Sequence, residues 1–324
     1  MTAKDRYRSL CREEVSIAIF SRDWWLDAVC GDERWDVLIV EERGRIVGAM
    51  PIYLPHPKVI SMPPYTQTMG PWLRPEPGDA KYSTVIGHRQ EVCKELVLRL
   101  TKYTAFLQNF DYKVTDWLPF YWGGYMQTTR YTYLIDNTAG DITENMTVHI
   151  RRQIKKAREK HGIRVRRGVG RDDFMRVNAL TFARQGRKAG HTDVLRRLID
   201  VALSRGQGDI WGGYDSEGRL HAAVFIVWQE SSAYYIAGGA DPTLRHSGSH
   251  ALVIREAMGD VAGYAPVFDF EGSMLPGVER FFRGFGAVQT PYFAVSKGKV
   301  SLLKRIIIKI SRGPLLKRDY DGDK

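Results

Sequence analysis

The chain has 324 residues, enough for about two domains of ordinary size. Its 44% hydrophobic and 26% charged residues are typical of a globular protein and exclude a disordered or fibrous one. A formal charge of +11 indicates an anionic partner: a nucleotide, an RNA, a phosphorylated precursor or an anionic membrane surface. Much of the basic excess lies in residues 151–171 and 297–318, which argues against a uniform groove for DNA.

Cysteine usage and the N-terminus indicate the compartment. Cys11, Cys30 and Cys93 lie far apart and form no Cys-x-x-Cys pair, as expected in a reducing environment. Neither a signal sequence nor an apolar run of about 20 residues occurs in the sequence. We therefore expect a cytoplasmic protein. The histidines follow no metal-ligand spacing, so no metal is expected.

In chain order, the first half begins with helices over residues 5–30. A strand, a turn at Glu42-Arg43-Gly44 and a second strand follow over 35–54. After a proline-rich segment, Val92, Leu96, Leu100 and Leu107 predict an amphipathic helix over 88–108. A short strand and loop over 113–124 is dense in aromatic residues.

The second half begins near Asp141. It reads as a basic helix over 145–157 and a strand over 163–167, followed by helices over 172–185 and 192–203. Three strands with tight turns then lead to Gly239. A helix over 249–261, a strand over 265–270, a short helix over 278–283 and a strand over 287–295 complete the pattern.

Residues 35–50 and 210–223 share a strand, an acidic-Gly turn and a second strand with small residues. Each pair leads to glycine, at Gly70 and at Gly238-Gly239. We therefore expect a duplicated, mixed α/β fold in which each twisted mixed sheet is flanked by helices. The expected parts are residues 1–135, 136–300 and a tail over 301–324, with a linker near 130–145. Two unrelated hairpins remain the alternative.

A polar loop between the strand ending at Gly238-Gly239 and the helix from Ser249 is the first candidate site. Helix N-termini direct unpaired N–H groups and the positive end of the helix dipole at an anion. Gly248 permits close backbone approach, and a serine can cap the helix or bind a phosphate. We expect a pyrophosphate site formed by Gly238, Gly239, Arg245, Ser247, Gly248, Ser249 and His250. An ordinary capped turn is the alternative.

The second candidate site is the stretch VFDFEGSMLPGVERFFRGFGA, residues 267–287. On a strand, Asp269 and Glu271 share one face, and Phe268 and Phe270 the other. A carboxylate among aromatics loses solvation, which raises its pKa and suits it to take a proton from an amine. We expect Glu271, Asp269 and Ser273 to be catalytic. In the alternative, Glu271 pairs with Arg280 or Arg283, or caps the next helix.

Four segments resemble the Fem-type branch of the GNAT superfamily, whose members are tandem-GNAT proteins. In chain order they are TQTMGPWL, the basic helix beginning Arg151-Arg152, GGADPTLRHSGSHAL and FEGSMLPGVERFFRGFGA. They follow the order of that family and together cover most of residues 20–295. The branch includes peptidoglycan aminoacyl transferases and acyltransferases near polysaccharide genes. The loop at Arg245 resembles the GNAT pyrophosphate loop, with His250 where Gly or Ala is usual.

The resemblance implies N-acylation, with acyl-CoA as donor and an amine of a cell-envelope glycan or amino-acid precursor as acceptor. Backbone N–H groups near Gly238-Gly239 would polarise the acyl carbonyl. Phe282 stands where GNAT enzymes often have a tyrosine acid, so Tyr292, His250 or water would protonate the leaving group. The second reading is a transferase that uses aminoacyl-tRNA and lipid-linked peptidoglycan precursor. The third is a binding protein without activity.

The sequence lacks the long helical arm that peptidoglycan aminoacyl transferases use, which favours acyl-CoA as donor. Trp122 and Tyr125 are candidate sugar-binding residues, although interdomain packing is the more ordinary role of such aromatics. Arg152 and Lys155 are candidate contacts to phosphates of the donor or acceptor, or belong to a solvated helix. The basic, amphipathic tail predicts peripheral contact with the anionic inner membrane face, or else packing on the domain.

Overall fold

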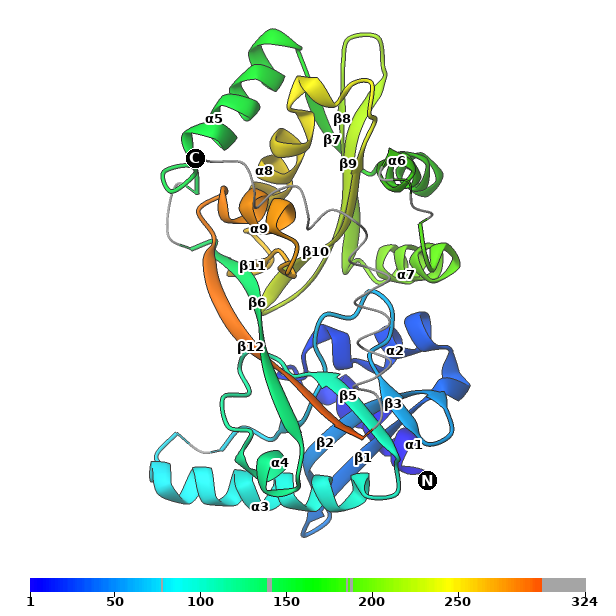
Figure 1. Ribbon diagram of the computed structural model, residues 1–324, viewed down its shortest axis with the longest axis vertical. Helices are drawn as coiled ribbons and strands as arrows, with labels where there is room; N and C mark the ends of the chain where they lie inside the picture. Colours follow the sequence, from blue (N-terminus) through cyan, green and yellow to red (C-terminus); the bar gives the residue numbers. More distant parts are fainter. Residues whose placement is uncertain (77, 139–141, 185, 187–188, 299–324) are drawn as a thin grey trace, which may run out of the picture.

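The computed structural model describes residues 1–76, 78–138, 142–184, 186 and 189–298 (Figure 1). Its strands form one 12-stranded mixed sheet in the order β1-β2-β3-β5-β12-β6-β11-β10-β9-β8-β7, with β4 paired to β2. Helices cover this sheet on both faces. The tail predicted over 301–324 lies outside the described residues.

The first half contains four helices and six strands. They are α1 (Ala3–Glu13), α2 (Asp23–Cys30), β1 (Trp35–Glu42), β2 (Arg45–His56), β3 (Val59–Ser61), β4 (Trp72–Leu73), α3 (Tyr82–Leu100), β5 (Ala105–Asn109), α4 (Leu118–Trp122) and β6 (Met126–Asp136). Two 3₁₀ turns, η1 (Ile19–Ser21) and η2 (Asp32–Arg34), flank α2.

The second half begins with an added helix and strand, α5 (Val148–Lys155) and β7 (Arg164–Arg167), joined by a π-helical turn, η3 (Lys156–Lys160). The other elements are α6 (Arg171–Arg184), α7 (Thr192–Ser204), β8 (Gly208–Tyr214), β9 (Leu220–Gln229), β10 (Ser232–Ala240), η4 (Arg245–Ser247), α8 (Ser249–Val261), β11 (Val267–Asp269), α9 (Pro276–Arg283) and β12 (Val288–Gly298).

The element order of the first half recurs in the second. Apart from α5, β7, β4 and the short turns, each half runs α-α-β-β-β-α-β-α-β. The sheet order is symmetric about the β12-β6 pair, since β5, β3, β2 and β1 lie outward on one side and β11, β10, β9 and β8 on the other. The duplication predicted from the two hairpins is therefore confirmed.

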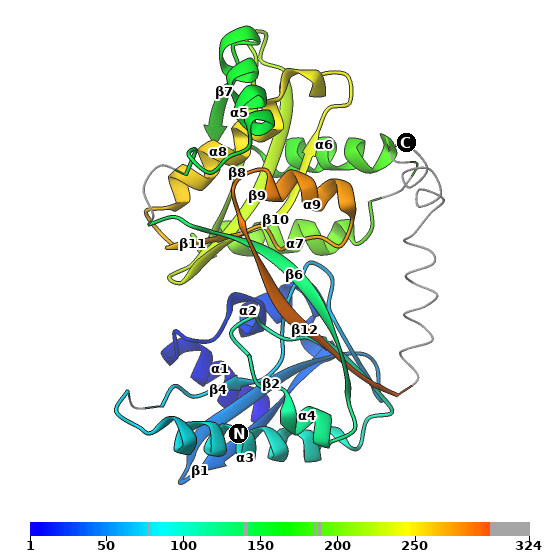
Figure 2. The ribbon, with the colours of Figure 1, turned by 60° about the vertical axis from the view of Figure 1, so that its left-hand side comes forward.

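The two halves exchange their last strands (Figure 2). Strands β6 and β12 pair antiparallel over Met126–Leu134 and Val288–Ser296. The end of β6 continues into the second half, where it pairs with β11. The end of β12 continues into the first half, where it pairs with β5. Residues 130–136, which were expected in a linker, belong to strand β6. Each half of the sheet therefore includes a strand from the other half of the sequence.

Burial explains why β9 is nearly all apolar. Every residue of β9 is buried, because α8 packs on one face of this part of the sheet and α6 on the other. A separate apolar core joins the halves, since Phe20 and Trp25 of the first half lie in one buried cluster with Leu198 of α7 and Tyr234 of β10.

Helix α3 differs from its prediction. It begins at Tyr82 and ends at Leu100, whereas residues 88–108 were expected. Val92, Leu96 and Leu100 face the core as predicted, but Leu107 lies in β5. The strand forms there because β5 is paired on both sides, with β3 and with β12. These pairings override the continued helical pattern.

Gly272 provides a test of the close contact between β6 and the segment after β11. It has φ +61°, and a Cβ there would overlap the carbonyl oxygen of Tyr131 and the Cα of Thr132. We expect Gly272→Ala to lower the free energy of unfolding by about 2–4 kcal/mol, from backbone strain and overlap. Chemical denaturation measures the change.

The matched control is Gly277→Ala in α9, where an added Cβ meets no atom within 4 Å. This change should leave stability unaltered or raise it by up to about 1 kcal/mol, because alanine favours helix. Equal stability of the two variants would contradict the close packing at Gly272.

Candidate functional site

Two parallel strands separate at the centre of the candidate site. β10 and β11 pair only through Ala233–Tyr234 and Phe268–Asp269. β10 has a bulge between Tyr235 and Ala237 and then continues alongside β9, whereas β11 ends at Asp269. The two strands run parallel up to this point, and β11 presents its C-terminal end here, the end of a parallel strand where α/β sheets commonly bind ligands.

Asp269 is buried at the point of separation, with 1% of its surface exposed. Its Oδ1 accepts hydrogen bonds from the Thr132 hydroxyl of β6 and, at 2.7 Å, from the backbone N–H of Glu271. Its Oδ2 is buried without a partner. Burial raises the pKa of Asp269 to about 7, although the bonds to Thr132 and Glu271 lower it. This carboxyl group therefore exchanges its proton near neutral pH.

Glu271 follows in a left-handed backbone conformation, with φ +57°. Its Oε1 is buried without a hydrogen-bond partner. Burial, and then the nearby charge of Asp269, raise the pKa of Glu271 well above its ordinary value. Among the residues that the structure describes, Glu271 forms no ion pair with Arg280 or Arg283. Arg283 pairs instead with Glu279, at 2.7 Å. The buried Asp269 and the half-buried Glu271 therefore each keep one buried oxygen without a partner, a feature that clusters at functional sites.

The first half contributes polar groups to the same place. Burial raises the pKa of Asp111, and the charge of Asp111 in turn raises that of Asp269. The side-chain amide of Gln67 lowers the pKa of Asp269, yet its buried Nε2 makes no hydrogen bond of normal geometry. The hydroxyl of Ser232, on β10, is also buried without a partner. The site therefore holds unpaired donors as well as unpaired acceptors.

Asp111 is the counterpart of Glu271 in the duplicated fold. Asn109-Phe110-Asp111 follows β5 as Asp269-Phe270-Glu271 follows β11. The N–H of Phe110 donates to the carbonyl of Phe293 on β12, and the N–H of Phe270 donates to that of Tyr133 on β6. The sequence analysis missed Asp111 and Gln67. The repeated polar-Phe-acid pattern was the available signal for Asp111.

The predicted pyrophosphate loop contains the expected glycine. Gly248 has φ +80° and directly precedes α8. Ser247 is fully buried, and its hydroxyl accepts from the N–H of Ser249 at 3.2 Å and bonds His221 Nδ1 at 3.0 Å. His221 Nε2 bonds the Asp215 carboxylate at 3.0 Å. Ser247 therefore fixes the loop internally, and its hydroxyl faces His221.

Helix α5 covers this loop. A Cβ at Gly248 would lie 2.5 Å from the carbonyl oxygen of Gln153 and 2.7 Å from its side-chain oxygen. Ser249 is buried too, with its hydroxyl against Gly213 and without a hydrogen-bond partner. Arg245 is exposed beside them. The residue types fit a phosphate cradle, but an anion reaches Gly248 only if Gln153 moves away.

The strand end at Gly238 and Gly239 is covered as well. Both glycines pair with β9, and a Cβ at Gly238 would overlap the hydroxyl of Tyr235. Gly239 packs against the α6 backbone at Val177 and Asn178. The Tyr235 hydroxyl bonds His250 Nε2 at 3.2 Å. Burial raises the pKa of Tyr235 and lowers that of His250 to about 4, so both are neutral at pH 7.

Phe282 and Ser273 have structural roles. Phe282 is buried, with its ring centroid 4.9 Å from Phe270 and 5.5 Å from Tyr235. The Tyr235 ring therefore packs against the Phe282 ring. Ser273 Oγ accepts from the N–H of Leu275 at 3.1 Å, which stabilises the turn before α9.

The predicted substrate contacts lie away from the carboxyl pair. Tyr125 is buried in the core of the first half against Phe106 and Phe120, and Trp122 is exposed on α4. Both precede the start of β6, whereas Asp269 meets Thr132 further along that strand. Arg152 and Lys155 are exposed on α5, the helix that covers the loop. The structure does not bring these four residues to Asp269.

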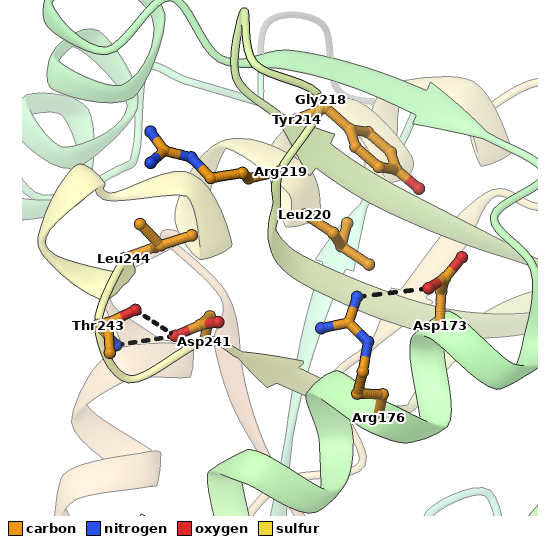
Figure 3. A pocket seen from close by; sticks show the side chains of 9 residues that line it. All are labelled: Asp173, Arg176, Tyr214, Gly218, Arg219, Leu220, Asp241, Thr243 and Leu244. Carbon is orange, nitrogen blue, oxygen red and sulfur yellow. Dashed lines mark hydrogen bonds and ion pairs between the residues drawn. The ribbon is translucent and has the colours of Figure 1, made fainter.

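A separate hollow of about 410 Å³ lies beside α6 (Figure 3). Its charged groups are largely paired within the chain: Arg176 with Asp173 at 3.3 Å, and Arg219 with Asp215 at 2.7 Å. Neither Asp269 nor Glu271 lines it. We assign the chemistry to the carboxyl pair because its groups are buried and unpaired, whereas those of the hollow are exposed and paired.

Comparison with known proteins identifies the domain in the second half. Residues 145–283 match the family model described as Acetyltransferase (GNAT) domain. This range includes α5, the Gly248 loop and both carboxylates. No curated protein matches the chain.

Solved structures match nearly the whole chain. The crystal structure of FemX covers 95% of this chain and 99% of its own, with 12% identity and a TM-score of 0.63. The C-terminal domain (DUF2156) of a putative lysylphosphatidylglycerol synthetase from Agrobacterium fabrum covers 85% and 87%, with 12% identity and a TM-score of 0.54. L-PGS from Bacillus licheniformis covers 82% and 85%, with 13% identity and a TM-score of 0.53.

Residues 145–283 therefore resemble a GNAT domain, and the chain as a whole has the Fem-type tandem-GNAT fold. Within the described ranges, no three His, Cys, Asp or Glu side chains are grouped to hold a metal ion. No helix in the part of the chain that the structure describes has the length and apolarity of a bilayer span.

The raised pKa of Asp269 predicts a pH-dependent effect of Asp269→Asn. Between about pH 4 and pH 7 the folded carboxyl keeps its proton and the unfolded one releases it, so the free energy of unfolding falls as pH rises through this window. The variant lacks this loss. We expect its stability relative to wild type to improve by about 2–4 kcal/mol from pH 4 to pH 8, measured by denaturant unfolding.

The control is Asp136→Asn, an exposed residue at the end of β6 whose pKa is lowered by Thr138. It should give no such gain at high pH. An Asp269→Asn variant whose relative stability is independent of pH would contradict a raised pKa at this position.

Proposed function

We propose that the protein is an N-acyltransferase that moves an acyl group from acyl-CoA to an amine. The observation that carries this proposal is the unsatisfied pair Asp269 and Glu271 at the point where β10 and β11 separate. A carboxyl group with a pKa raised toward neutrality is a suitable general base for an amine. The GNAT-domain match, which spans this pair, supports the same reaction class.

In the proposed reaction, the amine nitrogen attacks the carbonyl carbon of the thioester and the carbon–sulfur bond breaks. Glu271 takes the proton that the nitrogen loses. The thiolate gains a proton from the Tyr235 hydroxyl, and the tyrosine is then reprotonated through His250 or water. Tyr235 suits this role because its raised pKa keeps it protonated and because Phe282 has no proton to give.

The donor is proposed to bind with its phosphates at the N-terminus of α8. Gly248 has the backbone conformation that close approach needs, and Arg245 lies exposed on the same loop. Binding requires Gln153 to leave Gly248 and Tyr235 to move from Gly238. Arg152 and Lys155 lie exposed on α5, the helix that carries Gln153, and are proposed as further contacts to the donor phosphates.

The acceptor is proposed to be an amine of a cell-envelope glycan or amino-acid precursor, with a lipid-linked form as one source. The carboxyl groups of Asp111, Asp269 and Glu271 offer oxygen atoms that can accept hydrogen bonds from the N–H groups of an amine. The alternative reaction uses aminoacyl-tRNA as donor and lipid-linked peptidoglycan precursor as acceptor. Measuring whether the protein binds acyl-CoA or RNA distinguishes the two reactions.

A non-catalytic binding protein is the second candidate. The observations that favour it are the cover of Gln153 on Gly248 and of Tyr235 on Gly238, which together close the donor path. Under this reading the closure is permanent, and the acidic pair is a remnant of an active ancestor. Tight binding of acyl-CoA by the purified protein would exclude it.

Two substitutions test the proposal together. Glu271→Gln should lower kcat by about 100-fold or more and leave acyl-CoA binding unchanged, because it removes the base but not the donor loop. Arg245→Ala should raise the KM for acyl-CoA about 10-fold with little effect on kcat, because it removes a contact to phosphate. Thiol release with a panel of amine acceptors measures turnover, and native mass spectrometry measures donor binding.

Matched controls are Glu279→Gln and Arg255→Ala, which lie in α9 and α8 and pair with Arg283 and Glu256. Both should behave as wild type. Activity of wild type should rise with pH as Glu271 loses its proton, and Glu271→Gln should lack this rise. An unchanged kcat in Glu271→Gln removes this residue as the base, and an unchanged KM in Arg245→Ala removes the loop from the donor site.

A further inference from the structure

An exposed apolar patch lies at the far end of the first half. It consists of four side chains on α4 and at the start of β6: Leu118, Tyr121, Trp122 and Met126. Tyr121 is 60% exposed, Trp122 54% and Met126 69%. α4 packs on α3 through Phe120 and Pro119, so the helix is anchored and its other face projects outward. Large apolar side chains that share one exposed surface commonly mark an interaction site.

Lysines border this patch on two sides. Lys94 of α3 lies over the Trp122 ring, with its Nζ 5.6 Å from the ring centroid, and also pairs with Glu91 at 2.5 Å. Lys297 of β12 donates to the carbonyl of Gly123 at 2.6 Å and lies 4.8 Å from the centroid of Tyr125. Lys94 is thus held beside an exposed aromatic ring, and Lys297 beside the buried ring of Tyr125 at the edge of the patch. This combination suits a surface that is both apolar and negatively charged.

The chain leaves the described structure at the same place. β12 ends at Gly298, next to Lys297 and paired with Ala105 of the first half. The sequence from 299 to 318 contains seven Lys or Arg and no Asp or Glu, among apolar residues. More positive charge and apolar side chains therefore start from the edge of the patch.

We propose that this patch docks the protein on an anionic membrane surface. Tyr and Trp favour the interface between water and lipid, where their rings lie among headgroups. Lysines near an anionic leaflet add electrostatic attraction. Stable attachment takes two signals, and the α4 patch supplies one while the basic segment after Gly298 supplies the other. The positive border disfavours a second copy of the same patch as the occupant, since like charges would meet.

Docking here does not cover the carboxyl pair. The patch lies at the start of β6, and Asp269 contacts Thr132 further along the strand, toward the second half. The inference does not depend on catalysis, because membrane binding is measured without substrate. Its failure would leave the proposed acyl transfer untouched.

Vesicle co-sedimentation of the full chain tests the proposal. The probes are vesicles of phosphatidylcholine mixed with phosphatidylglycerol, and vesicles of phosphatidylcholine alone. We expect the protein to sediment with the mixed vesicles and to be released by salt. The triple variant Tyr121→Ser/Trp122→Ser/Met126→Ser should bind the mixed vesicles about tenfold more weakly. Lys94→Gln/Lys297→Gln should weaken binding severalfold, as expected for two cations near the lipid.

The matched control is Val288→Ser, an equally exposed apolar residue at the other end of β12. It should bind vesicles as wild type does. Circular dichroism confirms that each variant is folded. Three results would overturn the proposal: unchanged binding by the triple variant, equal binding of wild type to neutral vesicles, or a dimer in solution that the triple variant abolishes.

Discussion

β6 and β12 lie side by side across the middle of the molecule, and each ends in the sheet of the other half. Their ladder of backbone hydrogen bonds fixes the halves relative to each other, and the shared apolar core around Trp25 and Leu198 adds to it. The position of the candidate site depends on this exchange. Thr132 of β6, a strand that begins in the first half, bonds Asp269 of the second half.

Because β6 and β12 occupy equivalent positions, the ends of β5 and β11 are equivalent too. Each places an acidic residue, Asp111 or Glu271, directly after a buried phenylalanine. The halves are not identical: a buried Asp269 stands where the first half has Asn109, and the Gly248 loop belongs to the second half. The duplicated fold therefore brings several carboxyl groups to one junction, and burial raises their pKa values. A buried, unpaired carboxyl group costs stability, which proteins commonly tolerate at sites that use the proton.

Much of the second half was predictable from sequence because its signals are local. The alternating and apolar runs of β8, β9 and β10 and the helical spacing of α8 predict element ends close to those observed. Asp269 and Glu271 could also be singled out from the sequence, because they are near neighbours among aromatics; their catalytic role stays a prediction. Asp111 and Gln67 were missed because they reach the site only through the strand exchange. The exchange itself leaves no local pattern.

The contacts that cover the proposed donor loop could not be predicted from the sequence either. Gly248 predicts an accessible backbone, but its contact is Gln153, nearly one hundred residues earlier, on a helix that the basic pattern assigned to phosphate contacts. The sequence predicts Tyr235 as an ordinary strand residue. In the structure, its hydroxyl lies over Gly238, beside the bulge in β10. Both covers involve side chains or a helix end that can shift, so they are consistent with a site that opens when the donor binds.

The account rests on burial raising the pKa values of the carboxyl groups at this junction. A ¹³C NMR titration of the side-chain carboxyl of Asp269, assigned by comparison with Asp269→Asn, measures this directly. A titration midpoint near 7 would agree with burial at the strand exchange. A midpoint near the ordinary value of 3.8 would mean that the group is solvated or paired, and would contradict the proposed site.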